Sequence, residues 1–142
     1  MQEYIFDELL VGETGTFKQV VSAEMLSIFS SLSGDNNPLH CDEVYAKSLG
    51  HPSCVVHGML TSSLYSRLVG VYLPGKYALL QSIDIKFLSP VFVDDILTVI
   101  GEVTYRQNAY KVIEIKAKIE NQHKKCISKA KISVQVTDKD VN

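Results

Sequence analysis

Apolar and polar residues alternate along the second half of the chain, and this period is typical of strands that bury one face. Four stretches show it, each with charged or hydroxyl side chains between its apolar positions. The apolar positions are Ile83, Ile85 and Phe87; Leu97, Val99 and Val103; Ile113, Ile115, Ala117 and Ile119; and Ala130, Ile132, Val134 and Val136. The polar links at 106–108 and 121–124 are typical of hairpin turns. The pattern therefore predicts four strands, most of them antiparallel.

The first half of the chain has helical spacing instead. Met25, Ile28, Phe29 and Leu32 predict an amphipathic helix over 22–33 with Ser22 as its N-cap. Residues 42–49 predict a brief second helix that stops at a glycine. A longer helix is predicted over 58–72, apolar over most of its circumference, which indicates a buried helix.

These elements indicate one α+β domain over residues 1–142. A strand over 14–21 precedes the helices, and the hairpin-linked strands follow them. This order favours a mostly antiparallel sheet with one solvated face and one face packed on the buried helix. No repeat or interdomain linker interrupts the sequence.

Charge and cysteine content narrow the function classes. The net charge of −2 comes from 14 basic and 16 acidic residues scattered along the chain, so we expect no nucleic-acid partner. The start of the chain carries acids where a secretory signal needs basic residues, and no apolar run is long enough for a membrane span. The three cysteines, Cys41, Cys54 and Cys126, are odd in number and sparse. We therefore expect a cytoplasmic protein without a disulfide framework or a membrane partner.

Two short motifs carry the candidate chemistry. Residues 33–40 read Ser-Gly-Asp-Asn-Asn-Pro-Leu-His, and residues 56–59 read Val-His-Gly-Met at the start of the long predicted helix. Glycine, aspartate, asparagine and proline each favour turns, so 34–38 is predicted to be a loop. Asp35 and His40 would then lie on or beside it, close enough to share one small water site.

The first motif resembles the signature of the MaoC-like, or (R)-specific enoyl-CoA hydratase, family, which reads Gly-Asp-x-Asn-Pro-aliphatic-His. The second resembles the family's Val-His-Gly-Met sequence, in the same order and at similar spacing. The resemblance extends over nearly the whole chain and implies the hot-dog fold, in which an antiparallel sheet wraps around a long central helix. It also implies a homodimer whose sheets join edge to edge.

The family's reaction adds water to a trans-2-enoyl thioester, giving the (R)-3-hydroxyacyl thioester, or runs in reverse. It needs a base for water, an acid for the α carbon and a donor to the thioester oxygen. The sequence leaves open which of Asp35 and His40 is the base and which is the acid, and our working assignment makes His40 the base and Asp35 the acid. The resemblance assigns the donor to the backbone N–H of Gly58. The N-terminus of a helix suits that donor, because unpaired N–H groups point outward there. No cofactor or metal is expected.

The resemblance also suggests residues around the pair. Asn37 and Pro38 would fix the loop, and His57, Met59 and Ser66 would contact substrate. His57 has an alternative role as a helix cap or packing residue, and Ser66 has an alternative role in allowing close helix packing. The acyl group would be carried by coenzyme A or by acyl carrier protein, which present the same phosphopantetheine arm.

Rival interpretations remain open from sequence. His51, Cys54 and His57, with Cys41 nearby, contain zinc's preferred ligand types without a paired Cys-x-x-Cys. Cys41 or Cys54 could serve as a nucleophile beside a histidine. A hot-dog acyl thioesterase and a catalytically silent acyl-binding subunit are two further alternatives. The intact Asp35 and His40 count against both of them.

Overall fold

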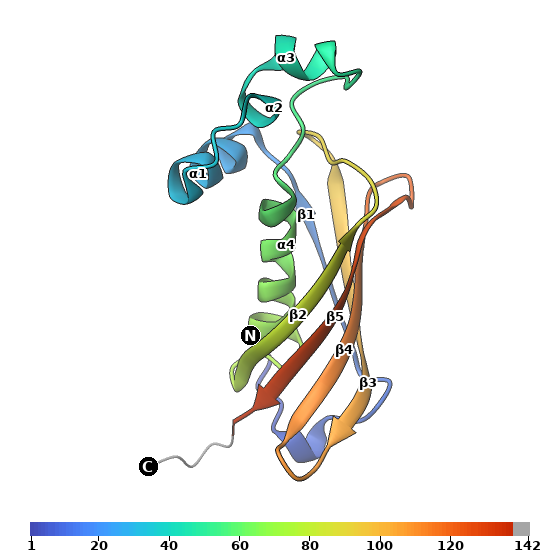
Figure 1. The fold of residues 1–142 in the computed structure, drawn as a ribbon. Helices are drawn as coiled ribbons and strands as arrows, with labels where there is room; N and C mark the ends of the chain where they lie inside the picture. The colour runs from blue at the N-terminus through green and yellow to red at the C-terminus, as the bar shows by residue number, and fades with distance from the viewer. Residues whose placement is uncertain (138–142) are drawn as a thin grey trace.

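A curved antiparallel sheet packed against one helix dominates the computed structural model, which describes residues 1–137 (Figure 1). The strands are β1 (Thr14–Val20), β2 (Ala78–Phe87), β3 (Ile96–Gln107), β4 (Val112–Glu120) and β5 (Cys126–Val136). The helices are η1 (Phe6–Glu8), α1 (Ala23–Ser33), α2 (Pro38–Cys41), α3 (Glu43–Ser48), α4 (Gly58–Arg67) and its π-helical continuation η2 (Leu68–Tyr72). The end of the predicted domain, 138–142, lies outside the described residues. None of the helices described is long and apolar enough to cross a lipid bilayer.

The sheet has the predicted antiparallel arrangement. Its strand order is β1-β3-β4-β5-β2, and every neighbouring pair is antiparallel. Tight turns join β3 to β4 and β4 to β5, so β1 and β2 form the two edges (Figure 1). Ile115 of β4 pairs with Val103 of β3 and with Ile132 of β5. This register brings the apolar positions of the three strands to one face.

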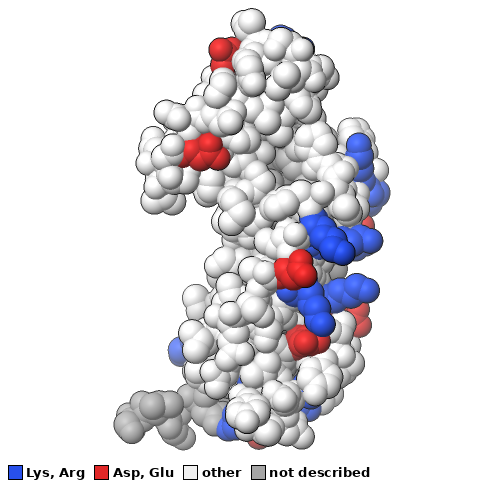
Figure 2. Space-filling view, in the orientation of Figure 1, with Lys and Arg blue, Asp and Glu red and all other residues white. Residues whose placement is uncertain are grey.

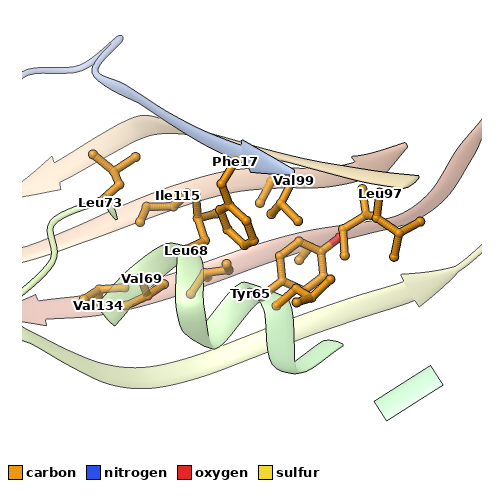
Figure 3. Packing of buried hydrophobic residues seen from close by; sticks show 14 of the residues in the cluster. Phe17, Tyr65, Leu68, Val69, Leu73, Leu97, Val99, Ile115 and Val134 are labelled. Atoms are coloured by element: carbon orange, nitrogen blue, oxygen red, sulfur yellow. The ribbon is translucent and has the colours of Figure 1, made fainter. Parts of the chain in front are cut away.

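The hydrophobic core lies between that face and the helix formed by α4 and η2 (Figure 3). Every alternate position predicted to face inward on β3, β4 and β5 is buried. Gly101 of β3 lies where Leu68 approaches the sheet, and a Cβ at Gly101 would stand 2.6 Å from Leu68 Cδ2. Close packing of η2 on the sheet therefore depends on a glycine here.

One polar contact crosses the core from α4 to β5. The hydroxyl of Tyr65 lies 2.8 Å from Ser128 Oγ, and both side chains are fully buried. Each hydroxyl gives the other the partner that a buried polar group needs. Burial raises the pKa of Tyr65 to about 12.

The helix predicted over 58–72 has the expected bounds but is less buried than expected. The sheet covers one side of α4 and η2, and among the described residues no second layer covers the other side (Figure 1). Met59, Ser63 and Ser66 are exposed on that open side. Helical periodicity identifies a helix face made of apolar or small residues. It does not show whether another part of the same chain covers that face.

Two further predicted core faces are partly open. Ile28 and Leu32 of α1 are exposed, because α1 packs at one end of the sheet through Leu26 and, in part, Phe29. On the edge strand β2, Ile83 and Phe87 are exposed although they alternate as predicted. The strand predicted over 14–21, the helix predicted over 42–49 and the cap of α1 by Ser22 are confirmed. Arg106 and Gln107, predicted to lie in a turn, belong to β3, and the short helix α2 was not predicted.

Candidate active site

The loop between α1 and α2 is built from turn and cap bonds. α1 ends at Gly34, whose φ of 76° lies in the left-handed region that favours glycine. Asp35 Oδ1 accepts the N–H of Asn37 at 3.3 Å, and Asn37 Oδ1 caps α2 by accepting a backbone N–H at 3.0 Å. Pro38 takes the first helical position, where its missing N–H costs no helical bond. A new helix thus begins just after Asp35 and carries His40.

His40 is oriented by a backbone carbonyl. Its Nδ1 lies 2.6 Å from the oxygen of Val55, which can only accept, so Nδ1 carries the hydrogen and donates it. The Nε2 atom is left with a lone pair, and it faces Asp35 Oδ2 at 3.9 Å. That gap is too long for a direct hydrogen bond and suits a bridging water. The side chains of His40 and Asp35 are 14% and 50% exposed, so water reaches both.

His57 lies directly beneath this pair. Its ring stacks on that of His40, with centroids 3.9 Å apart and planes inclined by 26°. Its Nε2 lies 3.0 Å from the backbone oxygen of Asp35 and 3.2 Å from Ser30 Oγ. The ring of Phe29 packs against it at a centroid distance of 4.9 Å. His57 is 1% exposed and therefore forms part of the floor beneath the pair.

Gly58 follows immediately as the first residue of α4. The first N–H groups of a helix have no partner within it and lie at the positive end of its dipole. The carbonyl of Gly58 accepts hydrogen bonds from the Thr61 and Ser62 hydroxyls at 2.7 and 2.9 Å, which stiffens this first turn. The ring of Phe87 lies so close that a Cβ on Gly58 would stand 3.1 Å from Phe87 Cε1.

A cavity of about 360 Å³ joins His40 to Gly58. It is lined by His40, Val55, Val56, Gly58, Thr61, Phe87, Leu88, Ser89, Pro90, Val91 and Ile127. The lining is mostly apolar with a few polar groups, as in sites for small organic ligands. One imidazole and one helix N-terminus thus line the same cavity.

A second, larger hollow lies elsewhere, on the outer face of the sheet. It measures about 960 Å³ and is lined by lysines, acids and small residues of β2, β3, β4 and β5. Figure 2 shows charged side chains of both signs gathered over these strands. None of the predicted site residues lines it, and its walls carry no histidine. The smaller cavity is therefore the candidate active site.

Residues 11–139 match the model of the MaoC-like domain family. The chain belongs to this family. Among curated relatives, it is 40% identical over 96 residues to an (R)-specific enoyl-CoA hydratase of Aeromonas caviae, covering 68% of this chain and 72% of the relative. It is 35% identical over 106 residues to a mitochondrial 3-hydroxyacyl-[acyl-carrier-protein] dehydratase of Arabidopsis thaliana, covering 74% of this chain and 63% of the relative.

Solved structures of MaoC-like proteins confirm the fold. An (R)-hydratase of A. caviae superposes with a TM-score of 0.87 at 32% identity, covering 91% of this chain and 98% of its own. An R-hydratase of Pseudomonas aeruginosa in its unliganded form superposes with a TM-score of 0.91 at 26% identity, covering 97% of this chain and 88% of its own. The curved sheet around α4 is the hot-dog fold.

The predicted site residues of this MaoC-like chain separate into two groups. The structure brings Asp35, His40, His57 and Gly58 together at one end of α4, with Asn37 and Pro38 in the connecting loop. Met59 and Ser66 lie on the open side of the helix, and neither lines the cavity. Within a single chain, these two residues face away from the site.

Several groups in the site carried no sequence signal. The carbonyl of Val55 orients His40, and any residue type offers a carbonyl. Ser30 reaches His57 from α1, where it reads as an ordinary polar helix position. Phe87 was assigned only to a strand by its alternation, and Ile127 was assigned no role, yet both line the cavity.

The metal and cysteine alternatives gain no support from the geometry. Within residues 1–137, the potential metal-ligating atoms that lie within 4.8 Å of one another belong to Asp35, His40 and His57. His51, Cys54 and His57 do not form such a group. His57 Nε2 donates its hydrogen to the backbone oxygen of Asp35 and so offers no lone pair to a metal ion. Burial and neighbouring acids raise the pKa of the Cys54 thiol, which disfavours a reactive thiolate.

Proposed function

We propose that this chain adds water reversibly to trans-2-enoyl thioesters, giving (R)-3-hydroxyacyl thioesters, without a metal or cofactor. One arrangement carries the proposal. The Nε2 of His40 faces the Asp35 carboxyl group across 3.9 Å, and His40 lines a cavity whose wall also includes Gly58 at the N-terminus of α4. The (R) configuration is taken from the relatives named (R)-specific hydratases.

The proton transfers balance within the pair. His40 Nε2 removes a proton from water while the water oxygen bonds to C3, and the C2–C3 π electrons move into an enolate. The Asp35 carboxyl group then gives its proton to C2, and the enolate pair forms the new C–H bond. One proton has moved from Asp35 to His40 at the end, and a water across the 3.9 Å gap returns it. Positioned proton transfer of this kind contributes about 10²–10⁴ in rate.

The enolate oxygen accepts a hydrogen bond from the backbone N–H of Gly58. This donor belongs to the rigid first turn of α4, so it is aimed before substrate arrives. A preorganised donor of this kind contributes about 10²–10³ in rate. Gly58 has no side chain, which lets the thioester approach closely.

The thioesterase alternative lacks its own base. In a thioesterase, hydrolysis would need a carboxylate elsewhere in the groove, besides Asp35, and none is among the residues found to line the cavity. A silent acyl-binding subunit is disfavoured because the bond from His40 to Val55 leaves Nε2 ready to accept a proton. Hydration is therefore the function that the geometry supports best.

The chain is further proposed to act as a homodimer joined at the β2 edges. Leu79, Leu80 and Ile83 are exposed along this edge strand, and Met59 and Ser66 are exposed on the open side of α4 beside it. A second copy would cover both surfaces and bring Met59 and Ser66 near an acyl chain. The three free cysteines fit a reducing cytoplasm.

The test is a spectrophotometric assay with enoyl thioesters of four to ten carbons, each carried by coenzyme A and by acyl carrier protein. The conjugated absorbance should fall without release of free thiol, and chiral analysis should find the (R) product. Asp35→Asn and His40→Ala should each slow the reaction by about 10²–10⁴. Free thiol release would favour the thioesterase, and no change with any substrate would contradict the proposal.

A further inference from the structure

We propose that His57 is a positioning residue for this reaction, holding the plane of the His40 ring by stacking and the place of Asp35 by a hydrogen bond. This inference rests on the proposed function and adds a role within it. His57 is set apart from the reacting atoms, because it is 1% exposed and does not line the cavity.

The hydrogen on the His57 ring is fixed by its neighbours. The backbone oxygen of Asp35 can only accept, and it lies 3.0 Å from Nε2, so Nε2 carries the hydrogen. Ser30 Oγ, 3.2 Å from the same atom, shares this donor. The Nδ1 atom is buried and has no hydrogen-bond partner within the described part of the chain. A second proton on this ring would therefore be buried without an acceptor, which is costly.

The stacking of His57 on His40 can stabilise the charge that forms on His40 during the reaction. When His40 takes a proton from water, its positive charge develops 3.9 Å from the face of His57. The electron-rich face of an aromatic ring attracts a cation, whereas a second charged ring would repel it. His57 can help only while it carries a single hydrogen, the one that Nε2 donates to the backbone oxygen of Asp35.

Neither a helix-capping role nor a packing role accounts for a histidine at this position. As a helix cap, a side chain would accept a hydrogen bond from the first turn of α4, and His57 makes no such bond. As a packing residue, phenylalanine would fill a similar volume without leaving Nδ1 buried and unpaired. The bond from Nε2 to Asp35 is the contact that specifically needs the imidazole.

The segment from Val55 to Gly58 therefore holds the whole site together. Val55 bonds the backbone of Leu39 at 3.0 Å and the ring of His40 at 2.6 Å, His57 bonds Asp35, and Gly58 offers its N–H. The two halves of the proton-transfer pair are thus positioned by adjacent residues. A misplacement of about 1 Å in such a site can lower the rate 10²-fold.

Three variants separate the two contacts. His57→Phe keeps a stacking ring without the donor, His57→Gln keeps an amide donor without the ring, and His57→Ala removes both. We expect kcat to fall about 10²-fold in His57→Ala and about tenfold in each of the others, with KM within about threefold of wild type. His51→Gln is the matched control, because His51 contacts Phe92 at a centroid distance of 6.3 Å away from the pair, and it should keep wild-type kcat.

A double variant distinguishes positioning from a structural role. A residue that acts through the unit formed by His40 and Asp35 should matter little once that unit is broken, so His40→Ala with His57→Ala should match His40→Ala within about threefold. An equal loss from His57→Ala in both backgrounds, or wild-type kcat in His57→Ala, would overturn the inference. Thermal unfolding checks that each variant is folded, and His57→Phe serves if His57→Ala is not.

A measurement without turnover separates this inference from the proposed function. Nitrogen-15 NMR of the wild-type ring nitrogens at pH 8 should show hydrogen on Nε2 of His57 and on Nδ1 of His40. Hydrogen on Nδ1 of His57 would overturn the inference even in an active enzyme. An inactive wild type with the expected nitrogen signals would instead contradict the proposed function alone.

Discussion

Replacing Gly58 with alanine should separate activity from stability. The new methyl group would stand 3.1 Å from Phe87 Cε1 and 3.4 Å from Cδ1 and Cζ of the same ring. These contacts are tight by a few tenths of an ångström, and the Phe87 side chain is 53% exposed and free to shift outward. Alanine is favoured over glycine in helices by up to about 1 kcal/mol, which offsets the contact. The free energy of unfolding should therefore change by less than about 1 kcal/mol.

Activity should respond much more strongly. The methyl group would project toward Phe87 into the cavity lining, where the thioester oxygen must come within hydrogen-bond distance of the Gly58 N–H. Loss of one preorganised donor costs about 10²–10³ in kcat, or about 3–4 kcal/mol of transition-state stabilisation. An assay of enoyl thioester hydration measures kcat, and unfolding in urea measures the free energy of unfolding.

Gly70→Ala is the matched control, because a Cβ there would meet no atom of the chain within 4 Å. It should keep wild-type activity. The reasoning is refuted if Gly58→Ala hydrates substrate within about threefold of the wild-type rate. It is also refuted if its loss of activity follows a loss of folded protein.

Two further predictions concern the core. Gly101→Ala would place a Cβ 2.6 Å from Leu68 Cδ2 and 3.2 Å from Ile115 Cγ2, and should lower the free energy of unfolding in urea by about 1–3 kcal/mol; an unchanged midpoint would contradict the packing described. Burial raises the pKa of Tyr65 to about 12, whereas the unfolded tyrosine ionises near pH 10, so its stabilising contribution is complete below pH 10 and is lost between pH 10 and 12. At about 1.4 kcal/mol per pKa unit the loss approaches 3 kcal/mol, and Tyr65→Phe should lack this part of the alkaline dependence.

The sheet could be predicted because its strands obey a simple rule. Along β4 and β5, positions such as Ile115 and Ile132 face the core of the same chain, so alternation in the sequence translates directly into burial. Ile83 on β2 alternates equally well and is exposed, since an edge strand has a neighbour on one side only. Periodicity identifies an apolar face and does not specify which element covers it, or in which copy of the chain.

The site could be predicted in part, for a similar reason. Asp35 and His40 stand close in sequence, and the turn residues between them made their proximity foreseeable. The stack of His57 on His40 depends on how the start of α4 meets α2, which no local pattern encodes. The orienting carbonyl of Val55 is a backbone group and leaves no trace in residue identity.

The account depends most on Asp35 and His40 acting as one unit. A double-variant cycle in kcat for hydration of a four-carbon trans-2-enoyl-CoA tests this directly, using Asp35→Asn, His40→Ala and the combination. The account predicts that each single variant loses about 10²–10⁴ in kcat and that the double variant is within about tenfold of the slower single variant. Losses that multiply in the double variant, or a single variant with wild-type kcat, would contradict it.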